Sequence, residues 1–156
     1  MNSYIEAMRA KVGHDTLMLP CSGVFVTKGG KLLLQRRKDS GKWADHGGSM
    51  EIGETFEETA KRELFEETGL VANSLEFFGL YSGKDFVCSY PNGDKACLVI
   101  AYWICEDFSG EFALQEDEVL ELKWFDFDDL PENMARLCKK PINDFVEAAK
   151  KRQGAQ

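Results

Sequence analysis

The sequence predicts an α/β protein in which a mixed central sheet lies between helices. Residues 55–68 carry apolar side chains at helical spacing, with Thr55 and Glu58 as a capping box and Gly69 as a stop signal. Residues 96–105 form an apolar run rich in β-branched side chains, which is typical of a strand buried on both faces. Helical and strand patterns are mixed along the chain, which argues against an all-α or all-β fold.

The other predicted elements follow from apolar periodicity and turn residues. Lys28-Gly29-Gly30 is a plausible hairpin turn between two of the strands. In chain order we expect a helix over 3–12, strands over 21–27 and 31–36, a glycine-rich loop over 41–53, strands over 75–82, 111–114 and 119–125, and a helix over 142–152.

Length and composition indicate one folded domain spanning residues 1–156. The chain has 156 residues, of which 44% are hydrophobic and 29% charged, as in a folded globular protein. Its five cysteines are odd in number and contain no CxxC pair, so we expect a reducing, cytoplasmic location and no structural zinc. We find no secretory signal, and the longest apolar run is too short to cross a bilayer, so no membrane partner is expected.

The chain is acidic, and its acidic residues are concentrated in two segments. It contains 27 Asp and Glu against 19 Lys and Arg, a net charge of −8. Residues 48–70 carry −5 and residues 106–132 carry −10. Because contacts to phosphate backbones need a basic face, we expect no binding of long nucleic acid. The acidic segments are either solvated surface or a site for a cation.

Three glutamates of the predicted helix could form such a cation site. Glu63, Glu66 and Glu67 stand at i, i+3 and i+4, so they share one helix face. Their mutual repulsion is relieved if the face binds a hard divalent cation such as Mg²⁺, which prefers oxygen ligands. An ordinary solvated helix is the alternative, and the spacing of the glutamates alone leaves both interpretations open.

A longer pattern contains these glutamates. Residues 48–70 resemble the Nudix box, G-x5-E-x7-R-E-U-x-E-E-x-G-U, where U is a bulky aliphatic residue. The specified positions are met by Gly48, Glu54, Arg62, Glu63, Leu64, Glu66, Glu67, Gly69 and Leu70. Weaker similarity in the segments KLLLQRR and ELKWFDFDDLP extends the match to about residues 20–131. The chain therefore resembles MutT-type Nudix hydrolases.

The resemblance implies a Nudix-type α/β/α sandwich and a catalytic role for the box. It implies hydrolysis of a nucleoside diphosphate linked to another group X, with Mg²⁺ or Mn²⁺ as cofactor. Glu66 and Glu67 would be metal ligands. Glu63 would be a further ligand or the base that orients water.

The resemblance also implies roles for residues around these three glutamates. The carbonyl of Gly47 would be another metal ligand, Arg62 would hold a box glutamate in place, and Glu54 would support the loop. Glu121 matches a position where some members place a late metal ligand or base, and Glu118 is its rival.

The loop that precedes the box departs from the family pattern. Members commonly read W-x-x-P-G-G, whereas this chain reads Trp43-Ala44-Asp45-His46-Gly47-Gly48. We interpret His46 as a solvated or structural residue rather than a catalytic one. The change affects the expected shape of the loop and the placing of the Gly47 carbonyl, and leaves the glutamates unaffected.

The expected substrate is a small nucleotide, with a nucleoside triphosphate or modified nucleotide favoured. An ADP-ribose or nucleotide-sugar pyrophosphatase is the alternative; the proline typical of ADP-ribose hydrolases would fall near Asp85, but the nearest is Pro91. A non-hydrolytic nucleotide-binding regulator and a prenyl-diphosphate isomerase on the same fold are further alternatives. A monomer and a homodimer both stay open.

Overall fold

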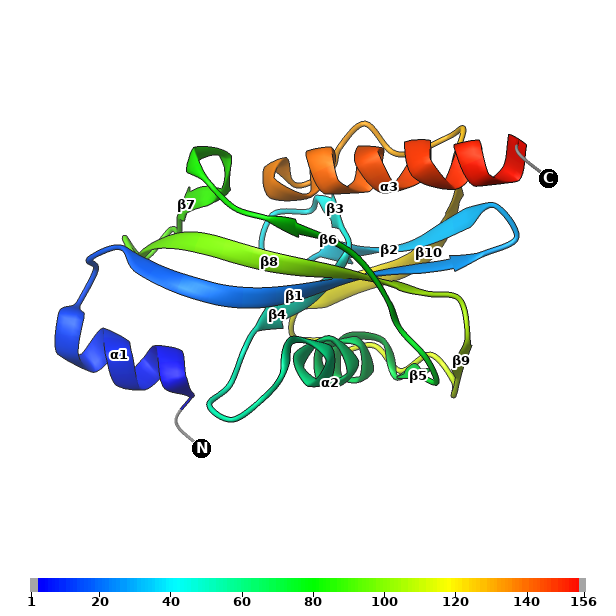
Figure 1. The fold of residues 1–156 in the computed structure, drawn as a ribbon. Coiled ribbons are helices and arrows are strands. Elements are labelled where there is room, and N and C mark those ends of the chain that lie inside the picture. Colours follow the sequence, from blue (N-terminus) through cyan, green and yellow to red (C-terminus); the bar gives the residue numbers. More distant parts are fainter. Residues whose placement is uncertain (1–2, 155–156) are drawn as a thin grey trace.

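A mixed sheet lies between two helices, with α3 over one face and α2 over the other (Figure 1). The computed structural model describes residues 3–154, so the two residues at each end of the predicted domain, 1–156, lie outside the described residues. The elements in chain order are α1 (Tyr4–Val12), β1 (Leu17–Lys28), β2 (Lys31–Arg37), β3 (Trp43–Ala44), β4 (His46–Ser49), α2 (Phe56–Thr68), β5 (Val71–Ala72), β6 (Glu76–Tyr81), the 3₁₀ helix η1 (Lys84–Phe86), β7 (Val87–Ser89), β8 (Lys95–Cys105), β9 (Phe108–Ser109), β10 (Val119–Asp126) and α3 (Arg136–Gly154).

The main sheet has the strand order β10-β2-β1-β8-β6. Its centre is the parallel pair of β1 and β8, in register from Leu17 opposite Ala96 to Val26 opposite Cys105. The other pairs along this order are antiparallel. β3, β4 and β7 add short pairings to β2, β1 and β8, and β5 pairs with β9 in a separate sheet. This arrangement confirms the predicted α/β fold with a mixed central sheet between helices.

The turn between β1 and β2 is the hairpin that the sequence predicts. Lys28 pairs with Lys31, which leaves a two-residue loop of Gly29 and Gly30. Both glycines have positive φ, 57° and 75°, as the tight hairpin turn compatible with strand twist requires. The turn places β2 beside β1, and α2 packs over β1 and the short strand β4 that pairs with it.

Two apolar clusters fix the helices on the sheet. On the α3 face the ring of Phe25 stacks on those of Tyr102 and Phe145, with centroids 4.7 Å apart in each pair. On the α2 face, the fully buried Ala60 and Leu64 pack against the sheet. Burial of Ala60 and Leu64 fixes the rotation of α2 about its axis, and this rotation also fixes the direction of its polar face.

α2 begins and ends as the sequence predicts. The Thr55 side chain accepts a hydrogen bond from the Glu58 backbone at 3.0 Å, and the Glu58 carboxylate accepts one from the Thr55 backbone at 3.1 Å. Gly69 is the C-cap. Because both ends are set by local capping, the helical phase of its carboxylates is also set locally.

Three segments differ from the sequence expectations. The glycine-rich loop 41–53 contains β3 and β4, which form because the segment lies against β2 and β1 and pairs with them. The predicted strand 111–114 is wrong: these residues are irregular, and the Ala113 backbone donates to the Thr68 carbonyl at 2.8 Å, at the end of α2. The first strand begins at Leu17, earlier than predicted, because its parallel pairing with β8 extends that far.

The last helix is longer than the predicted 142–152. It begins at Arg136 and contains Pro141, which is buried. Proline removes a backbone donor, and that loss makes an earlier start hard to predict from the sequence. Within residues 3–154, no helix is long and apolar enough to cross a membrane.

Gly23 is a position where the central sheet has no room for a side chain. A Cβ atom built there would overlap the ring of Tyr102. We expect Gly23→Ala to lower the free energy of unfolding by about 1–3 kcal/mol, because tightly packed cores resist added volume. Thermal and urea unfolding would measure this change.

Gly79→Ala is the matched control, since its added Cβ would lie at an ordinary 3.5 Å from Tyr81. Equal stability of the two variants would show that the Tyr102 ring yields to the added methyl group.

Candidate active site

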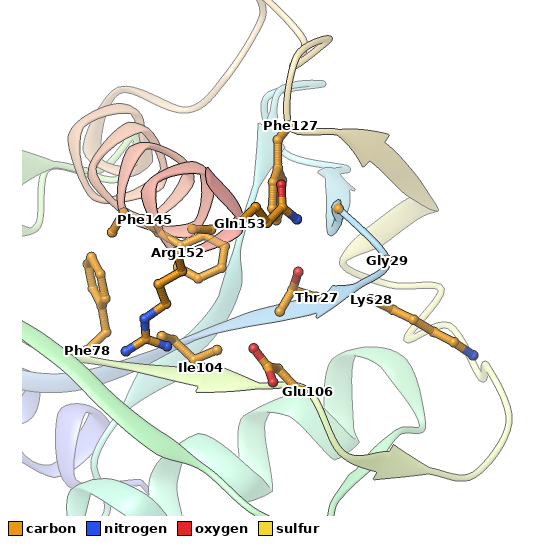
Figure 2. Close-up of a pocket in the computed structure, with 13 residues that line it drawn as sticks. Thr27, Lys28, Gly29, Phe78, Ile104, Glu106, Phe127, Phe145, Arg152 and Gln153 are labelled. Carbon is orange, nitrogen blue, oxygen red and sulfur yellow. The ribbon is translucent and has the colours of Figure 1, made fainter. Parts of the chain in front are cut away.

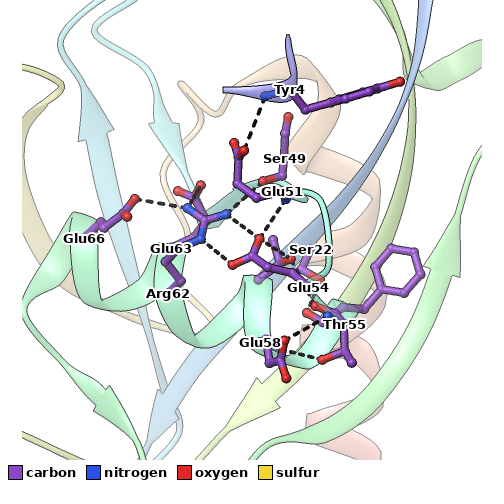
Figure 3. A network of polar contacts seen from close by, with 12 residues as sticks. Tyr4, Ser22, Ser49, Glu51, Glu54, Thr55, Glu58, Arg62, Glu63 and Glu66 are labelled. Carbon is purple, nitrogen blue, oxygen red and sulfur yellow. Dashed lines mark hydrogen bonds and ion pairs between the residues drawn. The ribbon is translucent and has the colours of Figure 1, made fainter. Parts of the chain in front are cut away.

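One guanidinium group ties together the acidic residues of the box (Figure 3). Arg62 donates to both oxygens of Glu54 at 2.6 and 2.9 Å, to Glu63 at 2.9 Å and to Glu66 at 3.3 Å. It also donates to the backbone carbonyl of Ser49 at 3.0 Å. A planar guanidinium with five donors suits this fork-like arrangement. Arg62 therefore joins α2 to the loop that precedes it.

Glu54 is hydrogen-bonded to the loop that precedes α2, and its role in supporting the site stays a prediction. Its carboxylate accepts the backbone N–H of Glu51 at 2.8 Å and the hydroxyl of Thr59 at 3.1 Å. Hydrogen bonds from Arg62 lower the pKa of Glu54 to about 2. Glu51 in turn accepts the backbone N–H of Tyr4 at 3.4 Å, which links α1 to the same loop (Figure 3).

Gly47 and Gly48 of β4 lie against two carboxylates of α2. A Cβ atom on Gly48 would overlap the carboxyl group of Glu63. The N–H of Gly47 donates to Glu67 at 2.9 Å, and a Cβ on Gly47 would overlap the carbonyl of Ser22. Bare backbone at both positions thus forms a cradle for Glu63 and Glu67.

Glu63 and Glu67 are held where a negative charge is unfavourable. The pKa of Glu67 is raised to about 8, chiefly by burial and further by the charges of Glu63 and Asp45. Burial also raises the pKa of Glu63, and the charges of Glu66 and Glu118 add to this effect. A cation placed among these groups would offset both the desolvation and the repulsion.

His46 is part of the core, which agrees with a structural interpretation. It is fully buried in β4, and burial lowers its pKa to about 4. Its Nε2–H donates to the carbonyl of Leu33 at 3.1 Å, so its Nδ1 accepts from the side-chain amide of Gln35 at 3.3 Å. A neutral imidazole with one donor and one acceptor nitrogen satisfies both contacts.

Glu121 and Glu118 lie differently with respect to the box. Glu121 forms an ion pair with Arg36 at 3.1 Å across β10 and β2. Successive side chains of a strand point to opposite faces of the sheet. Gln35 contacts Glu67 of α2, so the side chain of the next residue, Arg36, points to the other face. Glu121 is the cross-strand partner of Arg36 and points to that face too. Glu118 influences the pKa of Glu63. The role of Glu121 stays a prediction, and Glu118 is the acid within electrostatic reach of the box.

Gln35 is a site residue that sequence reasoning missed. It is buried in β2, and three acceptors surround its amide nitrogen and share its two N–H donors: Glu67, the carbonyl of Asp45 at 3.1 Å and Nδ1 of His46 at 3.3 Å. The available signal in the sequence is an uncharged polar residue directly after the apolar run Leu32-Leu33-Leu34. A buried amide of this kind needs hydrogen-bond partners, which makes it a marker of a polar site.

The carboxylate oxygens of the box suit a hard divalent cation, although in this structure they contact Arg62 and the backbone of Gly47. Glu63, Glu66 and Glu67 offer carboxylate oxygens, which Mg²⁺ and Mn²⁺ prefer. Across residues 3–154, no three acidic, histidine or cysteine side chains converge as a preformed metal site. Arg62 contacts Glu63 and Glu66 instead, and Gly47 contacts Glu67. Arg62 contacts one oxygen of Glu63 and one of Glu66, so a cation could bind at the other oxygens of these carboxylates or replace Arg62.

A separate cavity of about 590 Å³ lies between α3, the β1–β2 turn and the ends of β6 and β8 (Figure 2). Phe78, Phe127 and Phe145 form its apolar wall, and Arg152 and Glu106 lie at its rim. The cavity lies on the α3 side of the sheet, and no residue of the box lines it.

These observations define a class of α/β/α proteins in which a carboxylate-bearing helix faces a glycine-rich loop. Comparison with known proteins identifies the family, because residues 19–145 match the NUDIX domain. The chain therefore belongs to the Nudix family, as its box predicts.

Curated relatives and solved structures agree with this assignment. The chain is 33% identical over 148 residues to the NAD-capped RNA hydrolase NudC of Haemophilus influenzae (strain PittGG), covering 88% of this chain and 52% of that protein. It thus spans about half the length of this relative. It is 32% identical over 111 residues to the oxidized purine nucleoside triphosphate hydrolase of Danio rerio, covering 69% of this chain and 66% of that protein.

The structure of a MutT NUDIX hydrolase from Burkholderia pseudomallei has the same fold. It matches with a TM-score of 0.71 and 24% identity, over 81% of this chain and 97% of that chain. The mutator MutT protein from Bacillus halodurans matches with a TM-score of 0.59 and 28% identity, over 70% and 69% of the two chains.

The contact between Arg62 and Glu54 makes stability depend on pH. The pKa of Glu54 is lowered in the folded state. The contribution of this carboxylate to the free energy of unfolding is therefore complete above the pKa that Glu54 has in the unfolded chain, near 4.5. It is lost as the pH falls from there through about 2. We expect Glu54→Gln to cost on the order of 1–3 kcal/mol at pH 7, with a difference from wild type that shrinks below pH 4.5.

Thermal unfolding at several pH values between 7 and 2.5 would measure this effect. Glu57→Gln is the matched control, because Glu57 forms an exposed pair with Lys61 on the same helix. A stability difference between Glu54→Gln and wild type that stays constant down to pH 2.5 would contradict the assignment.

Proposed function

We propose that this chain is a hydrolase that cleaves the phosphoric anhydride linkage of nucleoside diphosphates joined to another group, with Mg²⁺ or Mn²⁺ as cofactor. One observation carries the proposal: Glu63 and Glu67 lie against the backbone of Gly48 and Gly47, and Arg62 pairs with both Glu63 and its neighbour Glu66. Membership of the Nudix family supports the same reaction class.

We expect the three glutamates to contribute differently to cation binding, because they differ in burial. Glu67 is buried and fixed by two N–H donors, which makes it the most rigid ligand. The side chain of Glu63 is 18% exposed and that of Glu66 is 47% exposed, so these two can exchange Arg62 for a cation at smaller cost. Glu63 also remains the candidate for the base that orients water.

Arg62 and Glu54 would position the site rather than touch the reacting atoms. The contact of Arg62 with Glu54 and the Ser49 carbonyl can persist while its contacts with Glu63 or Glu66 are released. A divalent cation held by Glu63, Glu66 and Glu67 would supply Lewis-acid chemistry, namely activation of water and stabilisation of the negative charge that develops on the phosphate. Glutamates on a capped, packed helix supply the positioning that this chemistry needs.

A small nucleotide, such as a nucleoside triphosphate or an oxidised nucleotide, is the favoured substrate. The similarity to the oxidized purine nucleoside triphosphate hydrolase supports this choice. The relatives named NAD-capped RNA hydrolase favour a second candidate, the pyrophosphate linkage of an NAD cap. The expectation that the chain binds no long nucleic acid therefore stays a prediction, as do its cytoplasmic location and a possible homodimer.

A screen of the purified chain with Mg²⁺ would test the reaction class. The substrates are dNTPs, oxidised dNTPs, ADP-ribose, nucleotide sugars, dinucleoside polyphosphates and NAD, with identification of every product. We expect turnover of at least one of them, and release of pyrophosphate, phosphate or a nucleoside monophosphate would show which bond is cut. No turnover on any of these substrates would contradict a hydrolase and favour a nucleotide-binding module.

Glu67→Gln tests the role of the buried ligand. Loss of one anionic ligand should lower kcat by roughly 10³-fold, because metal stabilisation of the transition state is worth several kcal/mol and each 1.36 kcal/mol is tenfold in rate. Glutamine keeps the volume of the side chain, so the fold should persist by circular dichroism. Glu57→Gln on the same helix should keep wild-type kcat, and a Glu67→Gln variant with similar activity would argue against metal binding by Glu67.

A further inference from the structure

Gln35 of β2 and His46 of β4 form a buried polar pair next to Glu67. Gln35 is 3% exposed and His46 is fully buried. Gln35 donates from its amide nitrogen to Glu67 and lies 3.3 Å from Nδ1 of His46. The pair thus connects the core of the sheet to one carboxylate of the box.

The hydrogen bonds of this pair allow a single arrangement. The Leu33 carbonyl is an acceptor only, so His46 must carry its proton on Nε2 and present the lone pair of Nδ1 to Gln35. The Asp45 carbonyl and the Glu67 carboxylate are also acceptors near the Gln35 amide nitrogen. If the amide were flipped, its oxygen would face the Asp45 carbonyl and Nδ1 of His46, both of which are acceptors, and this is electrostatically unfavourable.

The arrangement also determines which part of Glu67 is left free. Gly47 donates to one carboxylate oxygen and Gln35 donates to the other. Each oxygen has two lone-pair sites, so each retains one for a cation. Because both oxygens are already fixed, little rotamer freedom remains to be lost when a cation binds.

We propose that Gln35 and His46 are positioning residues that orient Glu67 for binding of a divalent cation. Nδ1 of His46 acts with the Asp45 carbonyl to set the orientation of the Gln35 amide, and Gln35 holds the carboxylate. In this chain a hydrogen-bonded core histidine thereby stands where the family pattern has a proline. The inference rests on the proposed function, since it assigns a role toward the same cation.

Mn²⁺ binding to the full chain, followed by electron paramagnetic resonance, tests the inference without using activity. Gln35→Met removes the donor while nearly keeping the side-chain volume. We expect it to bind Mn²⁺ about 10–100-fold more weakly, as is typical when a partner of a metal ligand is lost. Gln153→Met, at an exposed position at the end of α3, is the matched control and should bind as wild type does.

Kinetics give a second readout that a merely structural role would not change. In Gln35→Met the Mg²⁺ concentration for half-maximal activity should rise by a similar factor. KM for the nucleotide at saturating Mg²⁺ should stay unchanged, and the melting temperature should show that the fold is intact. Gln35→Asn, which keeps the amide on a shorter side chain, should also bind Mn²⁺ weakly.

The outcomes separate this inference from the proposed function. Loss of Mn²⁺ binding in Glu67→Gln with wild-type binding in Gln35→Met would overturn the positioning role and leave the hydrolase proposal standing. Absence of Mn²⁺ binding to the wild-type chain would overturn both. If Gln35→Met fails to fold, ¹⁵N NMR of the wild-type chain decides, because the inference requires a proton on Nε2 of His46 and is overturned by a proton on Nδ1.

Discussion

The contact of Arg62 with the acidic residues around it is the constraint on which the site depends. Its guanidinium reaches Glu54 in the loop, Glu63 and Glu66 on the helix, and the carbonyl of Ser49. Capping fixes where the helix starts, and core packing fixes its rotation. The ion pairs then fix the loop against the helix. Backbone and carboxylates thus meet at one place, although they come from different elements.

The same contact balances charges that would otherwise repel. The box contributes −5 to a chain of net charge −8, and two of its glutamates are withdrawn from water. Arg62 offsets part of this charge through its ion pairs, and a divalent cation would offset more of it. The acidity of the sequence is therefore compatible with a polyanionic nucleotide as substrate, because the local charge at the site falls when a cation binds.

The fold and the box could be predicted because their signals are local. Capping residues and apolar spacing define α2, and the box has its residues at fixed separations. The strands in residues 43–49 and the irregular segment 111–114 depend on what each segment packs against, which periodicity does not report. The role of Gln35 depends on a neighbouring strand, and a bulge between Val119 and Glu121 shifts the register that places the late acids. Such features arise from tertiary contacts.

Anomalous diffraction from a crystal of this chain grown with Mn²⁺ would test the account most directly. The account predicts a peak within about 2.5 Å of carboxylate oxygens of Glu63, Glu66 and Glu67, a distance typical of cation–oxygen bonds. It also predicts that Arg62 keeps its contact with Glu54. A Mn²⁺ peak found only in the acidic segment 106–132 would contradict it.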